Sequence, residues 1–149
     1  RFGYCFEQIA GSDYPAILKH HKIDDDRQPI VVDGPAGSLT AIPFRQIHGR
    51  IDALGFRIGD VAYSSDISDL PEESASFLEN LDCWIVDALR RDPHPTHFHL
   101  EKTLQHIEKF KPKRAILTNL HIDLDYETLC KELPPHIRPA YDGMVVTSD

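Results

Sequence analysis

The second half of the chain alternates apolar runs with amphipathic helical patterns, and this alternation constrains the fold more than any other feature of the sequence. The run CWIVDAL at 83–89 has the continuous apolar character of a buried strand, and LEKTLQHIEKF at 100–110 gathers its apolar residues on one helical face. The two patterns recur as RAILTNL at 114–120 and DYETLCKEL at 125–133. Strands that alternate with helices in this way predict an α/β fold in which helices cover the outside of a sheet.

Short strands joined by tight turns are expected in the middle of the chain and at its end. The pair Gly59-Asp60 suits a two-residue hairpin turn, and Pro71 followed by acidic residues is typical of a helix start. We predict strands at 30–32, 38–43, 56–58, 61–65, 137–140 and 144–147, a helix that starts near Pro71, and a short helix at 15–20. These elements are expected to form a single domain over residues 1–149.

The charge balance excludes some classes of partner. The chain has 16 Lys and Arg against 24 Asp and Glu, a net charge of −8 that repels polyanions, so we expect no extended nucleic-acid-binding face. The acidic run 24–26 and the pair His20-His21 are expected to lie in a solvated loop. The sequence has no run of 18 apolar residues that would predict a membrane span. Its three widely spaced cysteines predict neither a disulfide framework nor a thiolate zinc site, which suits a reducing cytoplasm.

Four polar residues stand where apolar strands stop. His48 follows AIPFRQI, Asp66 follows VAYSS, Asp87 ends CWIVD, and His121 follows AILTNL. Taken singly, a histidine beside a glycine suits a turn, and an aspartate before a helix suits a cap. Because sites in sheets covered by helices assemble at strand ends, the joint placement of these residues predicts metal ligands or acid–base groups.

The chain resembles the C-terminal half of metallo-beta-lactamase-fold hydrolases in the order of five segments, QIHGR, LGFRIGDVAYSSD, LDCWIVDALRR, HPTHFHLEKTL and AILTNLHIDLDY. The likeness is greatest to the phosphodiesterase branch, which includes the cyclic phosphodiesterase of phosphonate breakdown. It implies an incomplete, C-terminal portion of an α/β/β/α sandwich, with two divalent metal ions, zinc or manganese, bound by His48, Asp66 and His121. On this resemblance Asp66 bridges the two ions, which would supply the charge that a buried carboxylate needs.

The resemblance also implies an acid–base pair. In the branch that contains the tRNA-maturing endonuclease, an acidic residue at a strand end works with a histidine that opens a helix, and Asp87 and His94 occupy the similar places. We expect Asp87 to orient His94, which would protonate the leaving alkoxide or contact the phosphoryl oxygens. His97 is a second candidate for a phosphate contact, whereas His99 is expected to be a surface or capping residue. Asp125 is expected to cap the helix that follows it.

A strong signature of the family, a His-x-His-x-Asp-His segment, occurs nowhere in the sequence. In the family this segment supplies most ligands of both metals, so we expect a further N-terminal part of the fold that is deleted here or supplied by another polypeptide. The resemblance implies a small phosphodiester substrate or a nucleotide-like product, and it leaves a homodimer open. Two alternatives remain, namely an inactive remnant or non-enzymatic fragment, and a thioester or lactam hydrolase on the same fold.

Overall fold

The computed structural model describes residues 3–19, 21–23 and 26–147, so the predictions for His20 and for residues 24–25 lie outside the described residues. Its elements, with η marking a 3₁₀ helix, are η1 (Gly3–Cys5), β1 (Ile30–Gly34), β2 (Gly37–His48), β3 (Ile51–Ile58), β4 (Val61–Ser64), η2 (Glu72–Leu78), β5 (Cys83–Asp87), α1 (Leu100–Phe110), β6 (Arg114–Thr118), α2 (Tyr126–Glu132) and β7 (Ile137–Pro139). Among the described residues, no helix combines the length and the hydropathy that crossing a membrane requires.

The seven described strands form one mixed sheet, in which each strand pairs with its neighbours in the chain. The strands from β1 to β4 pair antiparallel, and those from β4 to β7 pair parallel. Parallel neighbours need crossover connections, which here contain η2, α1 and α2. Because β2 is antiparallel to β3 and β3 is antiparallel to β4, β2 ends at the same edge of the sheet as β4, β5 and β6.

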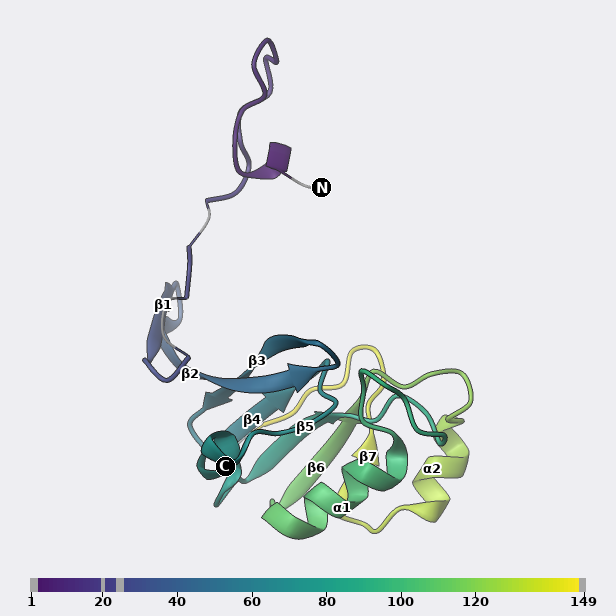
Figure 1. Ribbon diagram of the computed structural model, residues 1–149. Helices are drawn as coiled ribbons and strands as arrows, with labels where there is room; N and C mark the ends of the chain where they lie inside the picture. The colour runs from purple at the N-terminus through teal and green to yellow at the C-terminus, as the bar shows by residue number, and fades with distance from the viewer. Residues whose placement is uncertain (1–2, 20, 24–25, 148–149) are drawn as a thin grey trace.

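The hydrophobic core lies between the sheet and the two α-helices. Trp84, Ala115 and Ile137 are neighbours in the strand register, and all three are buried on one face of the sheet. The buried side chains of Ile107 in α1 and Leu129 in α2 belong to the same cluster. Figure 1 shows these two helices on one face of the sheet. The predicted α/β class, with helices outside a sheet, is therefore confirmed.

Most predicted elements are confirmed, including the hairpin about Gly59-Asp60 and both helices of the second half. The helix expected near Pro71 is the 3₁₀ helix η2, which begins just after that proline. Two predictions are wrong, because the described residues 15–19 form no helix and residues 144–147 form no strand. Short helices depend on tertiary packing, and Ile17 is 74% exposed. Figure 1 shows the N-terminal segment extending away from the sheet.

Candidate metal centre

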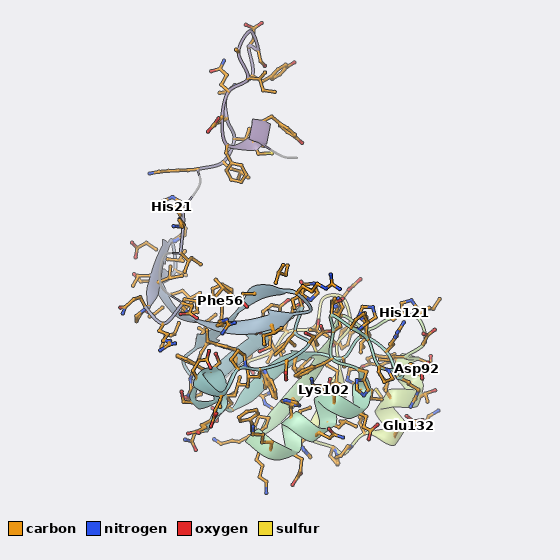
Figure 2. The ribbon with its side chains drawn as sticks, in the orientation of Figure 1. His21, Phe56, Asp92, Lys102, His121 and Glu132 are labelled. Atoms are coloured by element: carbon orange, nitrogen blue, oxygen red, sulfur yellow. The ribbon has the colours of Figure 1, made fainter. Side chains whose placement is uncertain are left out.

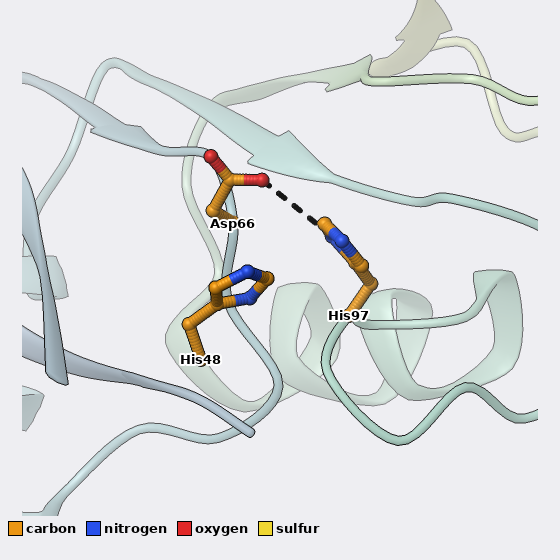
Figure 3. Close-up of side chains that lie close together, drawn as sticks. All are labelled: His48, Asp66 and His97. Carbon is orange, nitrogen blue, oxygen red and sulfur yellow. Dashed lines mark ion pairs between the residues drawn. The ribbon is translucent and has the colours of Figure 1, made fainter. Parts of the chain in front are cut away.

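Three side chains from different parts of the chain meet at the edge of the sheet where β2 and β4 end. His48 is the last residue of β2, Asp66 follows β4, and His97 lies in the loop between β5 and α1. Each offers one ligand atom, and these atoms all lie within 4.8 Å of one another. Figure 3 shows the three side chains facing a common point. The sequence predicted that His48 and Asp66 belong to one site, and the structure brings them together.

The ring of His48 is oriented by the loop that carries His97. Its Nδ1 lies 2.7 Å from the carbonyl oxygen of Thr96. A carbonyl only accepts, so Nδ1 carries the proton and Nε2 presents the lone pair that a metal ligand needs. The neighbouring Gly49 makes this approach possible, because its φ is +65° and a Cβ there would lie 2.5 Å from the Thr96 methyl group.

Asp66 has an unusual backbone conformation. Its φ is +54°, in the left-handed region that side chains other than glycine rarely adopt. Its carboxylate lies 3.8 Å from His97 Nδ1, and its side chain is 58% exposed. Strained residues of this kind persist where the surrounding structure fixes them, and they concentrate at functional sites.

Asp87 and His97 form the most buried polar pair of the site. The Asp87 side chain is fully buried, and one of its oxygens lies 2.7 Å from His97 Nδ1. The amide of Ile67 donates to the same oxygen over 3.3 Å, and Asn119 donates to the other oxygen over 3.3 Å. Burial raises the pKa of the Asp87 carboxyl, while these hydrogen bonds act in the opposite direction. The carboxylate therefore orients His97, and not His94 as the sequence led us to expect.

His94 lies beside this pair, and its ring carries the proton on the other nitrogen. Its ring centroid is 5.1 Å from that of His97, and the Thr96 amide donates to its Nδ1 over 3.3 Å. Since Nδ1 accepts, the neutral ring carries its proton on Nε2 and presents a donor. Desolvation and the nearby charges of Arg90 and His97 lower the pKa of His94, which favours this neutral form.

His121 lies apart from the three-residue group. It occupies the loop between β6 and α2, where Figure 2 labels it, and its side chain is 52% exposed. Its Nδ1 is 3.0 Å from a carboxylate oxygen of Asp123. The candidate ligand group found among the described residues does not include it. The role of His121 as a metal ligand thus stays a prediction, as do the catalytic roles of His94, His97 and Asp87.

Asp125 and His99 stand at the N-cap positions of the two α-helices, where the sequence led us to expect them. Asp125 caps α2, because its side chain accepts a hydrogen bond from the Thr128 amide over 2.9 Å. The Thr128 hydroxyl also donates to this carboxylate over 2.6 Å, and the two bonds together hold the pKa of the Asp125 carboxyl below its usual value. His99 is the N-cap residue of α1, but its side chain makes no capping hydrogen bond.

Sequence reasoning missed three residues that support the site. Asn119 follows β6 in the left-handed region and donates to Asp87, Thr96 accepts from His48, and the fully buried Gln46 donates to the carbonyl of Ser65. Asn119 could have been found from the sequence, because it is a polar residue directly after an apolar strand, as His48 and Asp66 are. Gln46 has a signal of its own, since it is a polar residue in an otherwise apolar alternation.

The donor set fits a divalent metal ion. Two imidazole nitrogens and one carboxylate oxygen are ligands that zinc and manganese both accept. The His97 ring, held through Nδ1 by a buried carboxylate, matches the support that metal-binding histidines commonly have. The same arrangement also suits a histidine that exchanges a proton with substrate, since the carboxylate stabilises its charged form.

Comparison with known proteins identifies relatives. A family model described as the beta-lactamase superfamily domain matches residues 1–122. An octanoyltransferase from Porphyromonas gingivalis (strain ATCC BAA-308 / W83) is 32% identical over 154 residues, which cover 100% of this chain and 30% of that protein. The chain thus spans less than a third of that relative.

Solved structures share the fold. A diphosphatase from the PhnP family is 33% identical with a TM-score of 0.77, over 89% of this chain and 49% of that one. The short form of human tRNase Z is 19% identical with a TM-score of 0.58, over 73% of this chain and 43% of that one. The chain spans about half the length of these structures. It belongs to the beta-lactamase superfamily and has the metallo-beta-lactamase fold, whose members usually bind divalent metals.

Proposed function

We propose that this protein is a metal-dependent hydrolase that cleaves small phosphodiesters or closely related phosphate esters. The observation that carries the proposal is the buried Asp87–His97 pair next to the converging ligand atoms of His48 and Asp66. Metal ligands alone would suit many hydrolases. A histidine supported by a buried carboxylate at the same point adds a group that can protonate an alkoxide as it leaves phosphorus.

His48 and Asp66 would hold a divalent metal, with His121 and the absent His-x-His-x-Asp-His segment as the further ligands that family resemblance implies. A bound pair of zinc or manganese ions supplies charge stabilisation and a water that is acidic enough to act as a nucleophile near neutral pH. Nitrogen ligands favour zinc, whereas the carboxylate and phosphate oxygens also accept manganese. The exposed side of Asp66 is where substrate would enter.

In this proposal His97 acts as the general acid. Its Nδ1–H donates to Asp87, so its Nε2 is the atom that gives a proton to the leaving oxygen. The fully buried Asp87 carboxylate accepts this hydrogen bond and fixes the orientation of the His97 ring. His94 has a complementary task, since its neutral ring presents an Nε2–H that can bind a phosphoryl oxygen.

One observation favours phosphate chemistry, and another favours a small substrate. The similar solved structure with 33% identity is described as a diphosphatase. The net charge of −8 disfavours long polyanions, so a small substrate is expected. A second candidate, hydrolysis of an acyl thioester, is motivated by the octanoyltransferase relative, although the match covers 30% of that protein.

The test compares turnover of bis(4-nitrophenyl) phosphate and an octanoyl thioester with zinc or manganese added. We expect the phosphodiester to be hydrolysed faster, and Asp66→Asn to lower its turnover roughly 100-fold or more because a metal ligand is lost. Asp60→Asn is the matched control, since it removes the same charge from the opposite end of β4. Faster thioester hydrolysis would favour the acyl reaction, and no turnover of either compound would favour an inactive remnant.

A further inference from the structure

The strained backbone at Asp66 is held from both sides by buried groups. Before it, the indole Nε1 of Trp84 donates to Ser64 Oγ over 3.1 Å, and the side-chain amide of Gln46 donates to the Ser65 carbonyl. After it, the Ile67 amide donates to Asp87 over 3.3 Å. Three of the four residues 64–67 are therefore held by these bonds, and the exposed Asp66 side chain stands between them.

Gln46 differs from the other groups that hold this segment. It is fully buried, yet its side-chain oxygen Oε1 finds no hydrogen-bond donor among the described residues. A buried acceptor without a partner destabilises the folded state, because water satisfied it in the unfolded chain. An apolar side chain of similar size would avoid that cost. What Gln46 provides and an apolar side chain could not is the hydrogen bond from its Nε2 to the Ser65 carbonyl.

The placement of Gln46 explains what this hydrogen bond does. Gln46 and His48 lie two residues apart on β2, so their side chains emerge on the same face of the strand. Gly55 on β3 lies opposite Phe44 and leaves room for both Phe44 and Gln46, because a Cβ there would lie 2.4 Å from the Phe44 ring and 2.8 Å from Gln46 Oε1. The strand that supplies one candidate ligand therefore also supports the segment that supplies another.

We propose that Gln46 is a positioning residue, which holds the peptide between Ser65 and Asp66 so that the Asp66 carboxylate faces His48 and His97. Its Nε2–H fixes the Ser65 carbonyl, and this fixes the direction of the peptide plane that enters the left-handed residue. Because Asp66 is a metal ligand only under the proposed function, the effect on metal binding rests on that function. The effect on the backbone of 64–67 does not.

The test uses Gln46→Met, which keeps the length of the side chain and removes both polar atoms. Zinc and manganese binding is measured by calorimetry, and the exchange of backbone amides in 64–68 and the melting temperature are measured without metal. We expect metal binding to weaken about 10- to 100-fold, as when other supporting partners of metal ligands are removed. Amide exchange in 64–68 should accelerate, while the melting temperature stays the same or rises.

Phe44→Leu is the matched control, because Phe44 is fully buried on the same face of β2 and packs on Phe77 at 5.5 Å. It should lower the melting temperature and leave metal affinity and the local exchange of 64–68 unchanged. If Gln46→Met lowers the melting temperature as Phe44→Leu does, without faster local exchange, Gln46 is only a core residue and the inference is overturned. If the unaltered protein binds neither metal, the proposed function fails, and faster exchange in Gln46→Met would still support the backbone role.

Discussion

Asp87 is the residue at which burial, charge and hydrogen bonding act most strongly together. Asp87→Asn keeps the size of the side chain but removes the negative charge that stabilises a protonated His97. We expect turnover of a phosphodiester to fall about 100-fold or more, since acid–base catalysis contributes on this scale. Metal affinity should change much less, because His48 and Asp66 are untouched. Steady-state kinetics and calorimetry on the same samples would check this.

Asp92→Asn serves as the control for that prediction, because Asp92 is an exposed carboxylate on the same loop. It should leave both quantities near their unaltered values. If Asp87→Asn lowered metal affinity as much as turnover, His97 would be a metal ligand that Asp87 supports, and a different residue would have to supply the proton.

The sequence could predict those site residues that stand at the ends of strands. His48, Asp66 and Asp87 stand at the ends of apolar strands, which the register then brings to one edge. The choice between His94 and His97 could not be made in this way, because both lie in a loop without periodicity. Tertiary hydrogen bonds set the path of that loop, among them Phe98 N–H to the Ile67 carbonyl at 2.5 Å.

At the scale of elements, the predictions were confirmed where the apolar residues of the sequence pattern are buried in the structure. α1 was predicted by its apolar face, and Leu100, Thr103 and Ile107 on that face are buried. The failures came at 15–19 and 144–147, where local composition suggested an element that the structure does not form. Thr147, the last described residue, accepts a hydrogen bond at its carbonyl from the guanidinium of Arg114.

His106 makes the stability of α1 sensitive to pH. Its ring centroid lies 4.6 Å from that of Phe98, with the two rings tilted against each other. Desolvation lowers the pKa of His106 most, the hydrogen bond from its Nδ1 to the Lys102 carbonyl over 2.9 Å raises it, and the charges of Lys102 and Lys109 lower it further. Below the ordinary histidine pKa of about 6.5, the unfolded chain therefore binds a proton that the folded chain resists. The free energy of unfolding should fall as pH drops below that value.

Chemical denaturation between about pH 5 and pH 7.5 would measure this effect across the ordinary titration range of histidine. His106→Phe should flatten the dependence in that window, because the group that titrates differently in the two states is gone. The exposed His136 provides the control, and His136→Gln should keep the slope. A slope that His106→Phe leaves unchanged would assign the effect to other groups.

At the scale of the whole molecule, the sheet buries the face that the helices cover, and part of its other face keeps apolar side chains partly exposed. By register, Phe56, Tyr63 and Ile85 are neighbours in one row, on the face opposite to Ala62 and Trp84. Tyr63 is 44% exposed, whereas Ala62 is fully buried beneath the helices. The sequence predicted the run at 83–89 as a buried strand, but it did not show which strands would carry a partly exposed row, because that depends on register.

This partly exposed row should make the chain associate with itself. Apolar surface in contact with water favours association, and this row offers the exposed Tyr63 between the half-buried Phe56 and Ile85. We therefore expect oligomers that grow with protein concentration, and binding of a dye that fluoresces on apolar surfaces. Tyr63→Lys places a charge in the middle of the row and should reduce both signals, with little change in melting temperature because Tyr63 lies outside the buried cluster. Tyr126→Lys, which alters a 37% exposed tyrosine of α2, is the control. Sedimentation velocity would measure the oligomeric state. A monomer that binds no dye at any concentration would contradict the prediction and would mean that the chain itself covers this row.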